Sequence, residues 1–257
     1  MDHTPTNIFE VYDMAEKIII IGEGSPVFPE DSYFHSAKTT LDVYDEILAS
    51  LCSPDRLLLD AGCGKKSMVQ RYSGKFRYST GMDISPEAIR QNKGFNAFIS
   101  GDAANLPFKD ESFDVVVSQW MIEHVDRIDE VVKEFHRVLK KGGSLVVVTN
   151  SKHHPMMILS SILPTKLRDW MKLRIFPVYI DEDTFPTYYR FNSLGTIDEL
   201  LSKAGFEKKF SSYTGSPFFL FNKFLFKLSE LYERVTDLKM LRLMKMHLVV
   251  HYVKPCR

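Results

Sequence analysis

The sequence predicts an α/β protein with a mostly parallel sheet of seven strands. Two observations support this prediction. Short apolar runs alternate with segments of helical periodicity, and the first of these runs, residues 57–59, ends in Asp60 and then two spaced glycines. Such a run is typical of a strand buried on both faces of a parallel sheet, and the glycines indicate a tight turn at its carboxyl end. The 257 residues, 44% of them hydrophobic, can bury the core of a single domain over 1–257.

Further strands and helices are expected in order along the chain. Ser85 precedes Pro86 and predicts the start of a helix after the second strand. Gly142 predicts the end of a helix before the fifth strand, and a helix over 194–204 is expected to end at Gly205. The predicted strands after the first cover residues 76–82, 97–100, 113–118, 144–149, 206–213 and 246–253.

Acidic side chains follow the first three predicted strands. Asp60, Asp83 and Asp102 stand at or just beyond the carboxyl ends of these strands, which is where open α/β sheets bind ligands. Gly62 and Gly64 let a ligand approach the main chain where a Cβ atom would obstruct it. Asp83 lies roughly 20 residues beyond the glycines, a spacing at which a carboxylate accepts hydrogen bonds from both hydroxyls of a ribose. The sequence therefore predicts a site that cradles a nucleotide-like ligand.

Four segments also carry a family resemblance: LLLDAGCG, GMDIS, GDAANLPFKDESFDVVVSQWMIEHV and LKKGGSLVVVTN. In this order and spacing they closely resemble the class I S-adenosylmethionine-dependent methyltransferases, in particular the small-molecule branch that includes quinone-biosynthesis methyltransferases. The resemblance covers the core over 56–150. It implies a Rossmann-like sheet with helices on both faces, an antiparallel last strand, and S-adenosyl-L-methionine as the cofactor.

The same resemblance implies which side chains bind the cofactor. They are Asp60, Gly62, Gly64, Asp83, Ile84, Asp102, Ala103, Ser118 and Gln119. The first three would line the methionine part, Asp83 would bind the ribose, Asp102 would hold the adenine amino group beside the backbone of Ala103, and the last two would flank the sulfonium. The chain departs from the family at Lys66, where a glycine or another small residue is usual.

Composition narrows the function further. The 33 basic and 33 acidic side chains cancel, so the broad positive field that nucleic-acid binding requires is absent. Cys52, Cys63 and Cys256 are scattered and lack the spacing of metal ligands, which predicts a reducing compartment and no structural metal. The first residues show no secretory signal pattern, so a cytoplasmic location is expected. The oligomeric state is left open.

Residues 1–55 are expected to form a helical cap over the cofactor cleft, with helices near 7–20 and 36–51. By analogy with the family, a residue between these helices covers the carboxylate of the cofactor. Tyr33 and Lys38 are the candidates for this role. The alternative is the commoner one, in which the lysine is solvated and the tyrosine is half-buried.

Residues 150–193 interrupt the expected succession of strand and helix and are predicted to be an insertion that caps the substrate. Within it, 166–174 mixes basic and apolar residues as interfacial helices do. Tyr188, Tyr189 and Arg190 lie on an apparent loop, where folds of this kind carry substrate choice, and are predicted substrate contacts. Loop packing with an internal ion pair is the alternative.

A second insertion, 217–243, separates the last two predicted strands and carries apolar positions at helical spacing. Its apolar run is too short to cross a bilayer. Three interpretations remain: a helix packed on the core, a lid over an apolar substrate, or a membrane-surface anchor. The density of aromatic residues favours an amphiphilic methyl acceptor, and peripheral membrane contact is a further expectation.

These observations predict methyl transfer by direct displacement to an oxygen, nitrogen or carbon atom of a small-molecule, lipid-like or saccharide acceptor. His124 is the candidate general base because its ordinary pKa is near neutrality. The alternative is that Glu123 and His124 only open a helix. A catalytically silent, cofactor-binding relative is the second functional hypothesis. A nicotinamide-dependent oxidoreductase is disfavoured, because Ser67 stands where its third glycine would lie.

Overall fold

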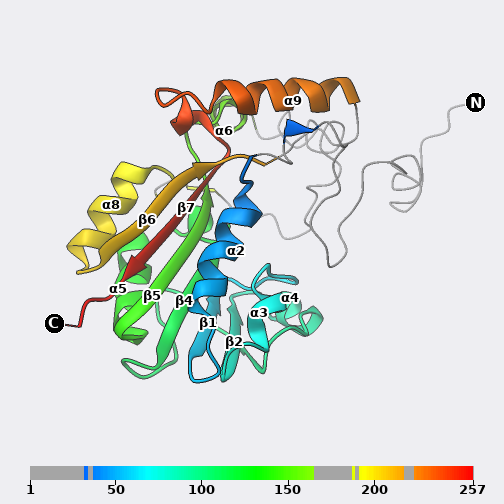
Figure 1. Cartoon of the computed structure of the whole chain (residues 1–257). Helices are drawn as coiled ribbons and strands as arrows, with labels where there is room; N and C mark the ends of the chain where they lie inside the picture. Colours follow the sequence, from blue (N-terminus) through cyan, green and yellow to red (C-terminus); the bar gives the residue numbers. More distant parts are fainter. Residues whose placement is uncertain (1–31, 34–36, 165–186, 189–190, 217–222, 257) are drawn as a thin grey trace, which may run out of the picture.

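The computed structural model describes residues 32–33, 37–164, 187–188, 191–216 and 223–256. One sheet contains β1 (Leu57–Ala61), β2 (Tyr78–Asp83), β3 (Ala97–Ser100), β4 (Phe113–Gln119), β5 (Leu139–Asn150), β6 (Glu207–Thr214) and β7 (His247–Val253). Their order across the sheet is β3-β2-β1-β4-β5-β7-β6 (Figure 1). The first five strands pair in parallel, whereas β7 is antiparallel to both β5 and β6. The predicted seven-stranded, mostly parallel sheet with an antiparallel last strand is confirmed.

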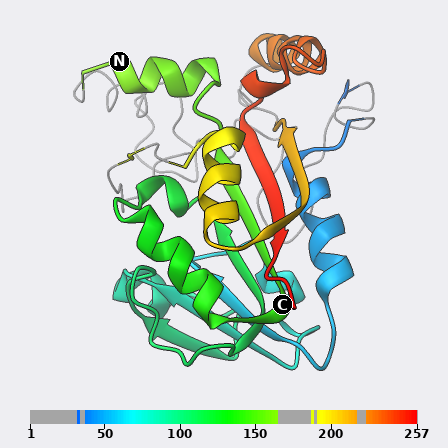
Figure 2. The same cartoon turned by 90° about the vertical axis from the view of Figure 1, so that its left-hand side faces the viewer.

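Helices cover both faces of this sheet. They are α2 (Thr40–Leu51), α3 (Gln70–Ser73), α4 (Pro86–Gln91), α5 (Ile128–Val138), α6 (Pro155–Ile162), α8 (Leu194–Lys203) and α9 (Lys223–Val235), with short 3₁₀ helices η2 (Ile122–His124) and η4 (Arg242–Met244). Figure 1 shows α5 and α8 on one face of the sheet and α2 on the other, while α6 and α9 lie beyond one end of it. Figure 2 shows the same arrangement from the side of α5 and α8.

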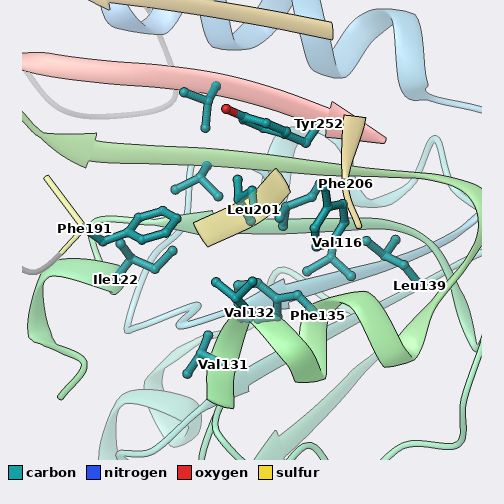
Figure 3. Close-up of a cluster of buried hydrophobic side chains, with 14 of the residues drawn as sticks. Val116, Ile122, Val131, Val132, Phe135, Leu139, Phe191, Leu201, Phe206 and Tyr252 are labelled. Carbon is teal, nitrogen blue, oxygen red and sulfur yellow. The ribbon is translucent and has the colours of Figure 1, made fainter. Parts of the chain in front are cut away.

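The alternation of side chains along β4 divides the core in two. Val116 packs with α5 and α8, whereas Val115 and Val117 pack with α2 on the opposite face. Figure 3 shows Val116 near Phe135 of α5 in the first of these clusters. Because both faces are covered, the strand reads as a continuous apolar run in the sequence.

Local signals set most helix starts. Ser85 caps α4, with its hydroxyl accepting from the amide of Ala88 at 3.2 Å, and Pro86 occupies the first turn. Thr39 and Asp42 form a capping box, so the helix expected over 36–51 begins at residue 40. The helix expected over 7–20 lies outside the described residues.

Two details differ from the sequence prediction. The segment after β4 that was expected to open a helix forms only the 3₁₀ turn η2. The glycines near residue 142 do not end a helix, because α5 already ends at Val138 and these residues belong to β5. Gly142 has φ +76°, and its amide donates to the carbonyl of Lys254 at 2.7 Å. This hydrogen bond to the segment after β7 holds the glycines in the sheet.

Candidate cofactor site

The turn after β1 is held by backbone hydrogen bonds. The amides of Gly62 and Cys63 donate to the carbonyl of Met82 at 2.8 and 3.0 Å. Gly62 has φ +83°, and a Cβ atom there would lie 2.5 Å from the Met121 side chain. Gly64 has φ +53°. Glycine is therefore required at 62 for both conformation and space, and it brings the turn close to the residues that follow β4.

Asp60 is a buried carboxylate beneath this turn. Neither of its carboxylate oxygens has a hydrogen-bond partner among the described residues. The pKa of Asp60 is raised to about 7, mainly by burial; the Ser67 hydroxyl opposes this shift and the charge of Asp83 contributes to it. The hydroxyl of Ser118, at the end of β4, is also buried without a partner in the described part of the chain. Buried polar atoms are nearly always paired, so these groups indicate a ligand site.

Asp83, at the end of β2, holds the neighbouring loops. Its Oδ2 accepts from the amide of Gly64 at 2.8 Å, and its Oδ1 accepts from the amide of Ser85 at 2.9 Å. The adjacent Ile84 is largely exposed, with 60% of its surface accessible. A carboxylate has about four lone-pair sites, so Asp83 can accept two further hydrogen bonds from a ligand.

Asp102 and Ala103 follow β3 and lie next to this group, since the amide of Gly101 donates to the carbonyl of Asp83 at 3.0 Å. Asp102 accepts from the amide of Ala104 at 2.8 Å and forms an ion pair with Arg127. Three strand ends thus place three acids along one edge of the sheet.

Gln119 connects the turn to the end of β4. This nearly buried side chain accepts from the amide of Met68 at 3.2 Å and donates to the hydroxyl of Ser67 at 3.0 Å. Lys66, the departure from the family pattern, is exposed in the same loop. The family resemblance implies that Gln119 lies near the cofactor, but no local pattern predicts this anchoring role, because its partners lie about 50 residues earlier.

The Glu123 carboxylate forms a buried network on the side of β5. It accepts from the Thr149 hydroxyl at 2.9 Å and from the Asn150 amide at 2.8 Å. Burial raises the pKa of Glu123, and the neighbouring His124 opposes this shift. Tyr188 is exposed, and its amide donates to the carbonyl of Glu123 at 2.8 Å, so this predicted substrate contact lies beside η2. The other two predicted contacts, 189–190, lie outside the described residues.

A second buried polar group occurs at the carboxyl ends of β4 and β5. His247 Nδ1 lies 3.0 Å from the Thr40 hydroxyl, which itself lies 3.0 Å from the Thr214 hydroxyl. The ring of Trp120 packs edge-on against His247, with centroids 5.6 Å apart. Burial lowers the pKa of His247 to about 3, so the imidazole is neutral near pH 7. No local sequence pattern predicts this group, because its members lie in separate elements.

Both residues that were candidates to cover the cofactor carboxylate, Tyr33 and Lys38, have other partners in the structure. The Tyr33 hydroxyl donates to Asp237, which follows α9, and its amide donates to Glu230 at 2.8 Å. Lys38 forms an exposed ion pair with Glu46 at 2.7 Å. Among the described residues, no group of three or more histidine, cysteine or acidic side chains is placed to hold a metal ion.

Comparison with known proteins identifies a methyltransferase domain within the chain. Residues 59–147 match the family described as methyltransferase domain. The chain is 28% identical over 196 residues to the ubiquinone/menaquinone biosynthesis C-methyltransferase of Rhizobium meliloti, which covers 66% of this chain and 74% of that enzyme. Residues 59–147 thus carry a methyltransferase domain, and the relatives matched here are named as methyltransferases. The demethylmenaquinone methyltransferase of Chlorobaculum tepidum is 31% identical to it over 141 residues, covering 50% of this chain and 56% of that enzyme.

A solved structure shares the fold of the methyltransferase. The S-adenosylmethionine-dependent methyltransferase of Methanosarcina mazei superposes with a TM-score of 0.53 at 23% identity, covering 82% of this chain and 98% of that one. The present chain spans about half the length of the Chlorobaculum enzyme and of several other curated relatives that it matches. The family and fold expected from the sequence motifs are confirmed.

The described residues fit the cofactor that this family implies. The buried Asp60 oxygens can accept hydrogen bonds from the methionine portion, and the turn is open at Gly64, where the nearest atom to a Cβ would be 3.8 Å away. The methyltransferase domain over 59–147 implies binding of S-adenosylmethionine and of its demethylated product.

Proposed function

We propose that the methyltransferase transfers the methyl group of S-adenosylmethionine by direct displacement to a small amphiphilic acceptor. The observation that carries this proposal is the buried carboxylate of Asp60, which lacks a protein partner among the described residues and lies beneath a turn that only glycine can form. A buried charge without a partner is costly, so such a group is retained where a ligand completes it. The bound cofactor supplies a methyl group already activated on a sulfonium.

The residues of the chain then bind and orient the cofactor. Asp60 and the glycine turn hold the methionine part, Asp83 accepts hydrogen bonds from the ribose hydroxyls, and Asp102 holds the adenine amino group. Ser118 and Gln119 flank the reacting end. Because the leaving group is already activated, alignment and exclusion of water supply most of the rate enhancement.

Proton removal is needed only for some acceptors. His124 lies in η2, next to the end of β4, and is the residue we assign to accept a proton from a hydroxyl or amine nucleophile. The buried carboxylate of the adjacent Glu123 is fixed by Thr149 and Asn150, which holds this turn in place.

The amphiphilic acceptor is favoured by two features. The exposed Tyr188 borders η2 on the acceptor side, and exposed apolar side chains gather at this end of the sheet. Two of the matched relatives are named for ubiquinone or menaquinone biosynthesis. Their acceptors support the same chemical class here, since quinone precursors combine a polar ring with an apolar tail.

The test is cofactor binding by Asp83→Ala, measured by titration calorimetry with S-adenosylmethionine and S-adenosylhomocysteine. Loss of a charged acceptor for two hydroxyls is expected to weaken binding by about 1.5–3 kcal/mol. Asp55→Ala, which removes an exposed acid before β1, is the matched control and should bind normally.

Two results would contradict the proposal. Unchanged affinity in Asp83→Ala, with the fold intact by circular dichroism, would remove Asp83 from the site. Cofactor binding by the wild type without release of S-adenosylhomocysteine in the presence of lipid, quinone or polar extracts would favour the catalytically silent alternative.

A further inference from the structure

Helix α9 packs its polar face inward. Ser229, Glu230, Glu233 and Thr236 are all buried, with at most 3% of the surface of each exposed. The apolar positions predicted at helical spacing in 217–243 point outward instead. Apart from Phe226, which is buried, this arrangement is the reverse of the usual surface helix, whose apolar stripe faces the core.

Specific partners hold the inward face. Glu233 forms a buried ion pair with Lys245 at 2.8 Å, beyond η4. Glu230 accepts from the hydroxyl of Ser32 at 2.5 Å and pairs with Lys227 at 3.0 Å. Rotating α9 to bury its apolar stripe would break the contacts of Glu233 with Lys245 and of Glu230 with Ser32, so these two contacts fix the outward orientation.

Helix α6 also carries exposed apolar side chains, at the same end of the sheet as those of α9. We call the two sets together the apolar platform; it consists of Ile158, Leu159, Ile162, Phe224, Leu228, Leu231, Val235, Leu238, Met240 and Leu243, each 36–87% exposed. These are ten of the fourteen large hydrophobic side chains that are exposed in the described part of the chain. Such a concentration marks an interaction surface, since scattered exposed residues need no explanation.

The two helices lie together at one end of the sheet. His154, the N-cap of α6, packs its ring against Tyr232 of α9 with centroids 5.5 Å apart. Figures 1 and 2 show both helices at the end of the sheet where β5 finishes. The parallel strands have their carboxyl ends on this side, where the predicted cofactor residues also lie. Both helices that carry the apolar platform therefore lie at the end of the sheet where its parallel strands finish.

Positive charge surrounds the apolar platform. Among the described side chains of residues 224–245, the exposed charges are four basic and one acidic: Lys227, Arg234, Lys239, Arg242 and Asp237. The whole chain, in contrast, has a net charge of zero. Glu230 and Glu233 are buried, whereas Lys227 and Arg234 of the same helix are exposed. The outer surface is therefore apolar with a cationic border.

We propose that the apolar platform docks on an anionic lipid surface. An apolar helix face bordered by Lys and Arg lies in the membrane interface, where apolar burial and attraction to acidic headgroups add together. A second copy of the chain fits less well, because it would bring two cationic borders together. No helix among the described residues is long and apolar enough to cross a membrane, so the contact is peripheral. Docking does not depend on the identity of the methyl acceptor.

The test is co-sedimentation of the full chain with vesicles of phosphatidylcholine containing one quarter phosphatidylglycerol, and with vesicles of phosphatidylcholine alone. The wild type should bind the anionic vesicles, and added salt should weaken binding. Leu228→Glu combined with Leu231→Glu should reduce binding roughly tenfold or more. Tyr78→Glu combined with Phe210→Glu is the matched control, since both residues are exposed apolar side chains outside the apolar platform.

Circular dichroism and cofactor affinity distinguish a loss of folding from a loss of docking. Both double variants should retain the circular dichroism and the cofactor affinity of the wild type. Equal vesicle binding by wild type and the Leu228/Leu231 variant would overturn the proposal. So would a wild-type dimer that this variant converts to monomer without any vesicle binding, because the apolar platform would then be an interface between copies. A monomeric wild type that does not bind vesicles would mean that another part of the chain covers the apolar platform. This result would also overturn the proposal.

Discussion

The replacement Asp60→Asn should stabilise the methyltransferase and weaken its cofactor binding. Asparagine keeps the size of the side chain but carries no charge. Burial raises the pKa of Asp60 from 3.8 to about 7, so the folded protein holds this proton more tightly than the unfolded chain. The contribution of Asp60 to stability is therefore full below pH 3.8 and is lost as the pH rises to 7. Each tenfold difference in proton affinity corresponds to about 1.4 kcal/mol, which sets an upper bound of about 4 kcal/mol for the loss.

The assay is urea denaturation of wild type and Asp60→Asn at pH 5 and pH 8. The free energy of unfolding of the variant, relative to the wild type, should increase by about 2–3 kcal/mol between these two pH values. The affinity for S-adenosylhomocysteine should fall, because the charge that faces the methionine part is removed. A stability difference that does not change with pH would show that the carboxylate is solvated and would refute the reasoning. Unchanged affinity would remove Asp60 from the site.

Two further predictions concern the glycine turn and helix α9. Gly62→Ala should lower stability and cofactor affinity more than Gly64→Ala. A Cβ at 62 would lie 2.5 Å from Met121, whereas the nearest atom to a Cβ at 64 is 3.8 Å away. Thermal unfolding and titration calorimetry of the two variants measure this difference. Equal effects would mean that the positive φ alone matters. Lys245→Met should cost about 3–5 kcal/mol at pH 8, since it leaves the buried Glu233 carboxylate unpaired. The cost should be smaller at pH 5, because burial raises the pKa of Glu233 and favours its neutral form; a larger loss at pH 5 would contradict this.

Local sequence patterns predicted the elements that bind the cofactor. The run before Asp60 is buried on both faces, so its composition alone indicates a parallel strand, and the cap at Ser85 depends only on adjacent residues. The family motifs place Asp83 and Asp102 because parallel strands bring their carboxyl ends to one edge. The hydrogen-bond partners of these side chains within the protein depend on the tertiary structure, because those partners come from other loops. The bonds from Gln119 to the loop at 67–68 have no local signal.

The orientation of α9 shows a different limit. Periodicity reveals which residues share a face of a helix, but not which face is turned inward. The usual rule places the apolar face on the core, since burial of apolar area is favourable. Here Glu233 and Glu230 are buried instead, and their partners Lys245 and Ser32 lie outside the helix, the latter 198 residues away. No pattern within 217–243 contains that information.

The position of β7 has a consequence for how the chain acquires its structure. This strand follows β6 in the sequence but lies between β5 and β6 in the sheet. A folding intermediate that contains only β1–β5 would present the unpaired edge of β5, rich in valine, as a template for intermolecular pairing. Closure of that edge requires Ser144 to meet Val253, a contact of high sequence separation that forms slowly. Aggregation during refolding should therefore depend on the rate of β7 insertion, and a peptide spanning 247–253 should compete for the open edge.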